Sequence, residues 1–174
     1  MSAPKAVYIH IPFCATKCFY CDFTAYVVDG QPVDDYLDAL AKEMEITLEN
    51  APSGKIESIF IGGGTPTVLN PYQMKKLLEK IHYYFPERSQ VVEFTMEANP
   101  GTTTPELLEV MQAGGVNRLS FGAQTFEPHL LKEIGRSHGV KEIAASVEEA
   151  RRAGFSNISL DLMFGLPNQT VAQM

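Results

Sequence analysis

The sequence predicts an α/β protein built on a parallel sheet, and three observations support this prediction. Short runs rich in β-branched and aromatic residues alternate with longer stretches of helical spacing about five times in 174 residues. Each intervening stretch is long enough for a helix that crosses over to a parallel neighbouring strand. Polar or glycine-rich segments follow the strands, at the edge where parallel sheets carry their binding sites.

Five runs are predicted as strands because β-branched and aromatic residues cluster in them and turn-forming residues bound them. In chain order they are residues 6–11, 56–61, 91–96, 118–121 and 157–163. Pro12 directly follows the first run and is expected to end that strand, because proline has no N–H group to donate.

Helices are predicted between the strands from apolar residues that recur at intervals of three and four. The first helix is expected to have Asp34 as its N-cap and to break at Pro52. The second is expected to have Asn70 as its N-cap and Pro71 at its first helical position, where the missing N–H costs nothing.

The second half of the chain continues the alternation of predicted strands and helices. Thr103 or Thr104 is expected to cap the third helix, which ends near Gly115. Further helical stretches are predicted at residues 128–134 and 140–153, and Thr170 is expected to start another helix. No internal repeat or low-complexity segment interrupts the pattern, so the length fits one domain.

The composition excludes several classes of protein. A formal net charge of −7 argues against a surface that binds nucleic acid or an anionic membrane. No apolar run approaches the roughly 18 residues of a membrane span. The first residues lack the layout of a signal peptide, and three free thiols fit a reducing compartment, so the cytoplasm is the expected location.

All three cysteines lie in one short segment after the first predicted strand. Cys14, Cys18 and Cys21 are spaced C-x-x-x-C-x-x-C. An odd number of thiols always leaves one without a disulfide partner. Three thiolates can instead fill three corners of a cubane iron–sulfur cluster and leave its fourth iron without a protein ligand.

Two other interpretations of the cysteines remain open at this stage. A zinc ion could take the three thiolates with His10 as a fourth ligand, although structural zinc sites usually draw on two separated ligand pairs. The three cysteines could also be unrelated buried residues, but the gathering of every cysteine in one loop argues against that.

The cysteine motif, with Tyr20 just before its last cysteine, resembles the signature of the radical S-adenosylmethionine (SAM) superfamily. The longer strings Tyr8-Ile-His-Ile-Pro-Phe-Cys14 and Cys18-Phe-Tyr-Cys-Asp-Phe23 resemble the oxygen-independent coproporphyrinogen III oxidase-like family. This resemblance runs from Tyr8 to the last residues. It implies a [4Fe–4S] cluster, SAM, and a partial (β/α)6 barrel of which about five βα units are present.

The resemblance also implies the residues of the site. The cluster would be held by Cys14, Cys18 and Cys21. SAM would be bound by Tyr8, Tyr20, Gly63, Gly64, Thr65, Glu97, Gln124, Arg136 and Asp161. The four histidines, His10, His82, His129 and His138, are expected to be structural or exposed.

Elementary chemistry agrees with several of these roles. The run Gly62-Gly-Gly64 has no Cβ atoms, which permits positive φ and a close approach of backbone to ligand. Glu97 can accept two hydroxyl hydrogen bonds from a ribose, and Arg136 can grip a carboxylate bidentately. Taken singly, Glu97, Arg136 and Asp161 also have ordinary alternatives as a helix-cap partner, a solvated charge and a turn former.

Two departures from the family pattern refine the expectation. The dehydrogenase branch has an additional cysteine two residues after the third, where this chain has Asp22-Phe23. This favours the heme-chaperone branch, with heme as cargo, a recipient hemoprotein, and a flavodoxin or ferredoxin as electron donor. The alternative is a coproporphyrinogen III dehydrogenase that acts through a 5′-deoxyadenosyl radical. Residues 1–174 are expected to form a radical SAM domain that stops before its last strand and lacks the family's C-terminal domain.

Overall fold

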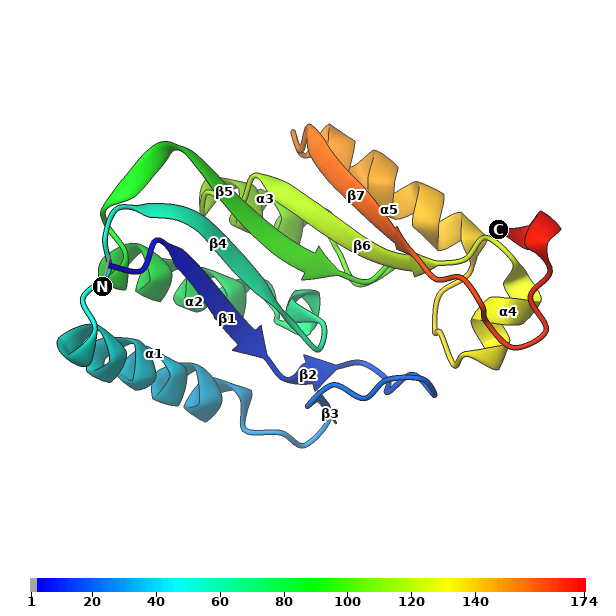
Figure 1. Ribbon diagram of the computed structural model, residues 1–174, viewed down its shortest axis with the longest axis horizontal. Helices are drawn as coiled ribbons and strands as arrows, with labels where there is room; N and C mark the ends of the chain where they lie inside the picture. Colours follow the sequence, from blue (N-terminus) through cyan, green and yellow to red (C-terminus); the bar gives the residue numbers. More distant parts are fainter. Residues whose placement is uncertain (1–2) are drawn as a thin grey trace.

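The computed structural model describes residues 3–174 and is organised around a five-stranded parallel sheet (Figure 1). The strands are β1 (Ala6–Ile11), β4 (Ile56–Gly63), β5 (Arg88–Ala98), β6 (Arg118–Gln124) and β7 (Asn157–Leu162). Their order in the sheet is β1-β4-β5-β6-β7, so strands that follow one another along the chain are neighbours. The predicted α/β class with five βα units is confirmed.

Five helices connect the strands. They are α1 (Val33–Asn50), α2 (Pro71–Tyr84), α3 (Pro105–Ala113), α4 (Pro128–Glu133) and α5 (Val140–Arg152). Neighbouring helices pack on one another, α1 on α2, α2 on α3, and α3 on α5. Figure 1 shows α2 and α3 behind the sheet, with α1 near β1 and α5 near β7.

Alternation along the strands gives the sheet two different faces, because successive side chains of a strand point in opposite directions. One face belongs to the hydrophobic core, which includes Ile9, Ile11, Ile59, Ile61, Phe94, Met96, Leu119 and Phe121. The other face carries polar residues at the intervening positions, among them Glu97, Arg118, Ser120 and Ser159. The site described below lies on this polar face.

The helix caps follow local chemistry in two of the three predicted cases. Asn70 accepts a hydrogen bond from the Gln73 N–H, and the Gln73 side chain accepts one from the Asn70 N–H, which completes a capping box. Thr104 caps α3 by accepting from the Leu107 N–H. The prediction for Asp34 is wrong: α1 begins at Val33 with Pro32 as its N-cap, two residues earlier than predicted, and Asp34 lies in its first turn.

A physical reason explains the earlier start of α1. The ring of Pro32 restricts its φ, and its carbonyl accepts the first helical hydrogen bond, from the Tyr36 N–H. Asp34 still favours the helix, since a carboxylate in the first turn interacts well with the helix dipole.

The five predicted strands all form, but three of them extend further than predicted. β4 continues to Gly63 and β6 to Gln124, and β5 already begins at Arg88. Glycine and polar residues carry no strand pattern, so the sequence alone does not indicate these extensions.

A second, two-stranded parallel sheet was not predicted. It pairs β2 (Phe13–Cys14) with β3 (Tyr26–Val27) at the two ends of the cysteine loop. The Tyr26 N–H donates to the Pro12 carbonyl at 2.7 Å, and the Val28 N–H donates to the Cys14 carbonyl at 2.9 Å. These bonds close the loop, but two-residue strands are too short to show a periodicity.

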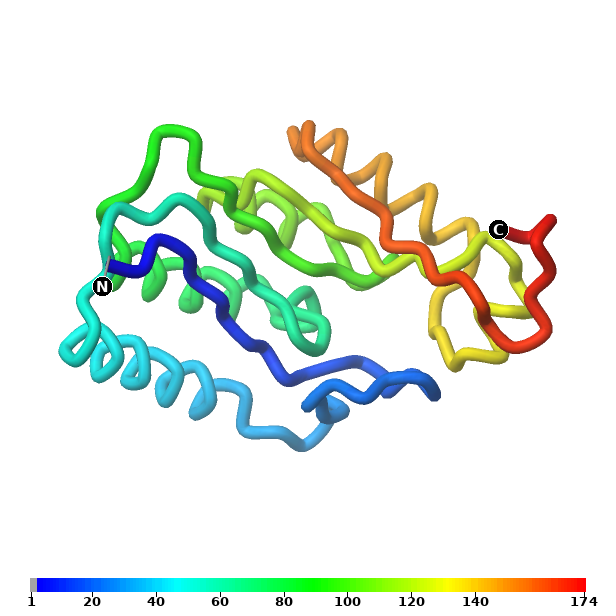
Figure 2. The backbone as a smooth tube through the Cα atoms, viewed as in Figure 1, coloured from blue at the N-terminus to red at the C-terminus, as the bar shows by residue number. Residues whose placement is uncertain are grey.

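The segment after β7 folds back against α4, as Figure 2 shows for the last residues of the chain. Leu166 and Met163 pack with Leu130 and Ile134 in a small apolar cluster of their own. This cluster fixes α4 beside the end of β7.

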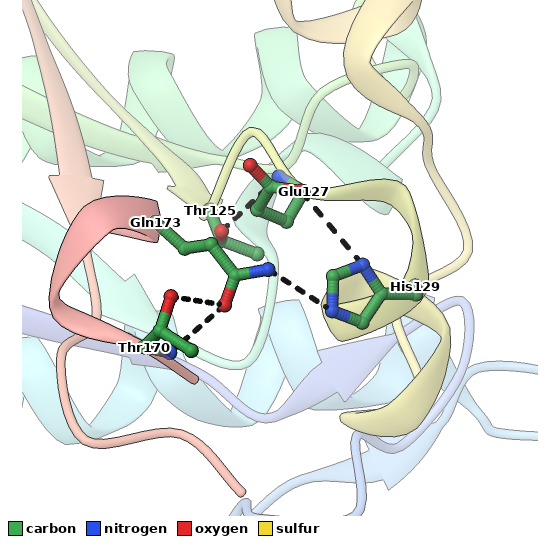
Figure 3. Close-up of polar contacts among 5 residues, drawn as sticks. All are labelled: Thr125, Glu127, His129, Thr170 and Gln173. Atoms are coloured by element: carbon green, nitrogen blue, oxygen red, sulfur yellow. Dashed lines mark hydrogen bonds and ion pairs between the residues drawn. The ribbon is translucent and has the colours of Figure 1, made fainter. Parts of the chain in front are cut away.

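The end of the chain is also held by polar contacts around α4. Thr170 precedes a single 3₁₀ turn, η2 (Val171–Gln173), where a longer helix was expected. The Gln173 side chain lies 3.4 Å from His129 Nε2, and His129 Nδ1 lies 3.8 Å from Glu127 (Figure 3).

Candidate functional site

A pocket of about 150 Å³ lies at the carboxyl ends of the strands, between the sheet and the cysteine loop. Eleven of the twelve predicted site residues line it: Cys14, Cys18, Tyr20, Cys21, Gly63, Gly64, Thr65, Glu97, Gln124, Arg136 and Asp161. They come from the loop after β1, from four of the five strands' ends, and from the segment after α4. Tyr8 is the one predicted site residue that does not line this pocket.

The three cysteines are free thiols on one wall of the pocket. Cys14 is buried, whereas Cys18 and Cys21 are half-buried and belong to a turn closed by a 3.1 Å hydrogen bond from the Cys21 N–H to the Cys18 carbonyl. Burial raises the pKa of the Cys14 thiol, and a contact from the Thr65 hydroxyl at 3.6 Å acts in the opposite direction. A cation or a metal centre beside these sulfurs would favour their thiolate forms.

The spacing of the thiols bears on the kind of metal centre they could hold. Within residues 3–174, no three His, Cys, Asp or Glu side chains are grouped tightly enough to hold a metal ion. In a cubane cluster each thiolate binds a different iron, so its cysteines lie farther apart than the ligands of one ion. Three separate thiols that line one pocket fit the ligand arrangement of a cubane cluster better than that of a single metal ion.

His10, the fourth ligand in the zinc alternative, is already engaged by the protein. Its Nε2 lies 2.9 Å from the Thr24 carbonyl and its Nδ1 lies 2.8 Å from the Tyr8 hydroxyl. The carbonyl can only accept, so Nε2 carries the hydrogen and Nδ1 accepts from Tyr8. His10 therefore ties β1 to the end of the cysteine loop, which agrees with the structural role expected for it.

The glycine run after β4 brings backbone to the pocket wall. A Cβ on Gly64 would lie 2.5 Å from the Phe13 carbonyl oxygen, and one on Gly62 would lie 2.6 Å from Glu97 Oε2. Gly63 has φ +111°, and a Cβ there would collide with the His10 ring. Only glycine fits at these positions, and the cradle they form leaves backbone groups accessible to a ligand.

Glu97, at the end of β5, faces the glycine run. Its Oε2 accepts a hydrogen bond from the Gly63 N–H at 3.1 Å. Burial raises the pKa of Glu97, the Gly63 N–H lowers it, and the nearby Asp161 carboxylate raises it. Because this carboxylate accepts one hydrogen bond among residues 3–174, it retains the capacity to accept hydroxyl groups of a ligand.

Arg136 crosses the pocket and contacts both of its sides. Its Nη2 donates to Asn99 Oδ1 and to the Gly122 carbonyl, both at 2.6 Å. Its Nη1 donates to Cys18 Sγ at 3.3 Å and to the Tyr20 hydroxyl at 3.4 Å. The terminal nitrogens are thus used by the protein, and the bidentate carboxylate contact stays a prediction.

The third guanidinium nitrogen of Arg136, Nε, indicates that an acceptor from a ligand would fit here. Nε is buried and has no hydrogen-bond partner among residues 3–174. An unsatisfied buried donor costs about 1–3 kcal/mol, more for a charged group. An acceptor oxygen of a bound ligand would remove this cost, which is what a carboxylate-bearing cofactor such as SAM offers.

Gln124 and Asp161 complete the wall formed by β6 and β7. Gln124 has φ +65°, an uncommon value for a residue other than glycine, and its carbonyl accepts from the Met163 N–H at 2.8 Å. Asp161 accepts hydrogen bonds from the Ser120 hydroxyl at 3.0 and 3.1 Å. Both side chains line the pocket as predicted, opposite the cysteine loop.

Tyr8 lies at a different hollow, a groove of about 390 Å³ between β1 and α1. Its ring stacks near Phe60, and its hydroxyl donates to His10. In this structure Tyr8 contributes to the site indirectly, because it holds the His10 ring that supports Gly63 and the cysteine loop.

Seven residues that line the pocket were not predicted from the sequence, and three of them form hydrogen bonds to Arg136 or Asp161. These three are Asn99, Ser120 and Gly122. Asn99 joins Thr65, to which it donates at 2.8 Å, with Arg136. A hint of its role was present in the sequence, since Asn99 directly follows β5, two residues after Glu97. However, a single asparagine before a proline is also typical of ordinary turns.

Comparison with known proteins identifies the superfamily of the chain. Residues 8–174 match the Radical SAM superfamily, and the chain belongs to that superfamily. The [4Fe–4S] cluster and SAM that the sequence indicated are the cofactors of the superfamily. The residues around the pocket fit these two groups, because they include three thiols together with glycine backbone, two carboxylates and a guanidinium.

Several individual proteins are similar to the chain. The heme chaperone HemW of Bacillus subtilis is 51% identical over 170 residues, which are 98% of this chain and 45% of that protein. The oxygen-independent coproporphyrinogen-III oxidase-like protein HemZ of Bacillus subtilis is 39% identical over 173 residues, covering 97% of this chain and 34% of HemZ. The chain therefore spans less than half the length of these relatives.

A solved structure with the same architecture is that of coproporphyrinogen III oxidase HemN of Escherichia coli, described as a radical SAM enzyme. It superposes with a TM-score of 0.88 and 32% identity, over 99% of this chain and 40% of HemN. In the described part of the chain, no helix has the length and apolar character needed to cross a membrane.

Proposed function

We propose that this chain is the cofactor-binding part of a heme chaperone, which binds heme and delivers it to a recipient hemoprotein. The observation that carries the proposal is the 51% identity to a protein named heme chaperone HemW, which extends over 98% of the chain. The sequence after the last cysteine, Asp22-Phe23, supports the same branch, because the dehydrogenase pattern has an additional cysteine there.

In this proposal Cys14, Cys18 and Cys21 hold a [4Fe–4S] cluster. Three thiolates satisfy three irons, and the fourth iron remains available to a small chelating molecule. When bound, the cluster supplies an electron that can cleave SAM. The buried Cys14 anchors the cluster to the sheet, while the turn that carries Cys18 and Cys21 is tied to α4 by the Phe19 N–H, which donates to the Ile134 carbonyl at 3.1 Å.

The same proposal assigns the opposite wall of the pocket to SAM. The backbone of Gly63 and Gly64, with Thr65, would meet its methionyl amino group, and Glu97 would accept hydrogen bonds from its ribose hydroxyls. Arg136 would meet its carboxylate through the buried Nε. The remaining contacts would come from Gln124, Asp161 and Tyr20, with Tyr8 in a supporting position behind His10.

Partners and location follow from this function. Heme is the proposed cargo, a hemoprotein the recipient, and a flavodoxin or ferredoxin the electron donor, since cluster reduction needs a one-electron source. We propose that the protein acts in the cytoplasm, where the half-buried thiols of Cys18 and Cys21 stay reduced.

The second candidate is an oxygen-independent coproporphyrinogen III dehydrogenase. It is favoured by the similarity to HemN, at 32% identity and a TM-score of 0.88. Such an enzyme abstracts hydrogen from two propionate chains of its substrate, and therefore needs repeated, productive cleavage of SAM.

One pair of assays separates the two functions, and it uses the full natural polypeptide loaded with its cluster. We expect heme to bind in an anaerobic titration followed by absorbance. We expect no conversion of coproporphyrinogen III to protoporphyrinogen IX by chromatography under reducing conditions. Turnover without heme binding would replace the chaperone by the dehydrogenase, and absence of both activities would contradict both candidates.

A further inference from the structure

A row of polar side chains leads from Arg118, at the start of β6, to Asp161 in the pocket. Arg118 and Ser120 lie two residues apart on β6, and Ser159 and Asp161 lie two residues apart on β7. Ser120 is the register partner of Ser159 in the parallel pairing of the two strands. Because side chains alternate along a strand, all four residues share one face of the sheet.

These four side chains are joined by consecutive hydrogen bonds. Arg118 Nη2 donates to Ser159 Oγ at 3.0 Å, and Ser159 Oγ lies 2.9 Å from Ser120 Oγ. The Ser120 hydroxyl donates to Asp161 Oδ1 at 3.0 Å and to Oδ2 at 3.1 Å. The row thus links a cation to a carboxylate through two hydroxyl groups.

Chemistry and distance together favour one direction for the hydrogen bonds in this row. A guanidinium can only donate, an ionised carboxylate can only accept, and each hydroxyl has a single hydrogen. Ser159 accepts from Arg118, and its own hydrogen has two acceptors within reach, Ser120 Oγ at 2.9 Å and the Leu119 carbonyl at 3.5 Å. The shorter contact favours Ser120, whose own hydrogen then points to Asp161. Hydrogen bonds aligned head to tail in this way polarise one another, most strongly away from water, and Ser120 is only 6% exposed.

Arg118 has no carboxylate within ion-pair distance in residues 3–174. Its Nη1 donates to Thr95 Oγ1 at 3.2 Å, and Thr95 in turn donates to Glu93 at 3.1 Å. The guanidinium thus reaches one carboxylate, Glu93, through Thr95 and another, Asp161, through Ser159 and Ser120. Such an arrangement gives Asp161 a directed donor without bringing the guanidinium into the pocket.

We propose that Arg118, Ser159 and Ser120 form a positioning relay that orients the Asp161 carboxylate for SAM. This inference rests on the proposed SAM site. Both Asp161 oxygens accept from one side, that of Ser120, so their remaining lone pairs are available to a ligand. The relay also holds Asp161 near a second carboxylate, Glu97, with which it interacts unfavourably.

The test measures SAM affinity of the cluster-loaded protein by anaerobic equilibrium dialysis, in two backgrounds. In the native background, Ser120→Ala and Ser159→Ala are each expected to weaken SAM binding about tenfold. Ser120→Ala removes the hydrogen bond to the Asp161 carboxylate, and Ser159→Ala removes the contact that orients the Ser120 hydroxyl. In an Asp161→Ala background the same two substitutions are expected to change the affinity less than about twofold, because the carboxylate that the two serines orient is absent.

Conservative and matched variants complete the design. Ser159→Thr retains the hydroxyl and is expected to keep the affinity within about twofold of the native protein. Ser146→Ala removes a buried hydroxyl that accepts from the Gly101 N–H, far from Asp161 in the hydrogen-bond network. This control is expected to lower the melting temperature and to leave SAM affinity unchanged.

The outcomes separate the relay from the site on which it rests. Equal losses for the serine variants in both backgrounds would overturn the relay, since the serines would then act on the fold alone. If Asp161→Ala weakens SAM binding and the serine variants do not, the relay is overturned while the SAM site stands. If Asp161→Ala itself leaves SAM affinity unchanged, the proposed site is wrong at Asp161 and the relay is overturned with it.

Discussion

Arg136 donates a hydrogen bond from Nη1 to the sulfur of Cys18 at 3.3 Å, although the two residues are 118 positions apart in the sequence. Nη2 of the same guanidinium donates to Asn99 and Gly122, at the ends of β5 and β6. The contact therefore connects a proposed cluster ligand to the sheet through one cation. Hydrogen bonds to cluster sulfurs and nearby charge are two of the factors that set the reduction potential of an iron–sulfur cluster.

Arg136→Met is therefore expected to lower the reduction potential of the reconstituted cluster. A positive charge and an N–H group beside a cluster sulfur stabilise the added electron, and the substitution removes both. A differential effect of about 1 kcal/mol corresponds to roughly 40 mV for a one-electron couple. The measurement is an anaerobic redox titration followed by electron paramagnetic resonance.

A matched control for this experiment is Arg151→Met. Arg151 is on α5 and donates to the Phe155 carbonyl at 3.1 Å, away from the cysteine loop. An unchanged potential is expected there. A potential that stays the same in Arg136→Met as well would show that the contact with Cys18 is not made to the cluster-bound thiolate.

Anaerobic reconstitution is expected to load about four irons and four sulfides per chain, as three thiolates around one cubane require. Cys18→Ala is expected to abolish this cluster, measured by iron and sulfide analysis and by the loss of its broad visible absorption. His10→Gln is expected to retain iron, because His10 is engaged by Tyr8 and Thr24. Stoichiometric zinc uptake without iron under these conditions would contradict the prediction.

The raised pKa of Glu97 makes the stability of the SAM-free protein depend on pH. Burial is the main cause, so the folded protein holds a proton on Glu97 at a higher pH than the unfolded chain does, relative to the ordinary pKa of 4.5. The contribution of Glu97 to stability is therefore fully present below pH 4.5 and is lost as the pH rises through the folded pKa. Glu97→Gln keeps an acceptor for the Gly63 N–H. Because glutamine does not ionise, the variant does not lose stability at this position as the pH rises.

Thermal unfolding of Glu97→Gln and of the native protein across about pH 4.5 to 7.5 tests the sign. The variant is expected to become relatively more stable as the pH rises, by on the order of 2 °C in melting temperature. In the same variant SAM affinity is expected to fall, because the charged acceptor for the ribose is lost. Melting curves that stay parallel over this pH range would contradict the assignment of the raised pKa to Glu97.

The glycine cradle is expected to be intolerant of even one methyl group. Gly64→Ala would place a Cβ 2.5 Å from the Phe13 carbonyl oxygen, a backbone atom of the neighbouring β2 that cannot move independently. We expect a loss of about 1–3 kcal/mol in the free energy of unfolding, measured in urea, together with weaker SAM binding.

Gly139→Ala is the matched control for the cradle. A Cβ there would meet only Glu142 Oε2, at 3.0 Å, which is the movable end of a flexible side chain. Both unfolding free energy and SAM affinity are expected to stay close to native. A Gly64→Ala protein as stable as Gly139→Ala would mean that the cradle is wider in solution than in this structure.

Much of the fold could be predicted because its causes are local. The five strands follow from β-branched and aromatic runs, and Asn70 and Thr104 cap helices through bonds to residues three positions away. The Asp34 prediction failed because another residue, Pro32, competed for the same boundary. The short pair β2-β3 was missed because its hydrogen bonds join residues that show no pattern in sequence.

The sequence by itself determined which chemistry gathers at the pocket. Three cysteines in one loop, a glycine run, and Glu97, Gln124 and Asp161 at or beside strand ends must meet at one edge, because parallel strands all end on the same side of a sheet. That argument needs only strand order and direction, which local pattern supplies.

The tertiary structure alone decided which of these groups touch. Arg136 reaches Cys18, Ser120 bonds to Asp161, and Tyr8 forms a hydrogen bond with His10 and does not line the pocket. Each of these contacts depends on the register between strands and on the path of a loop, to within about an ångström, the tolerance of a hydrogen bond. Periodicity and motif spacing specify the face and the edge on which a residue lies, but the partner of a donor is settled only when the strands are packed.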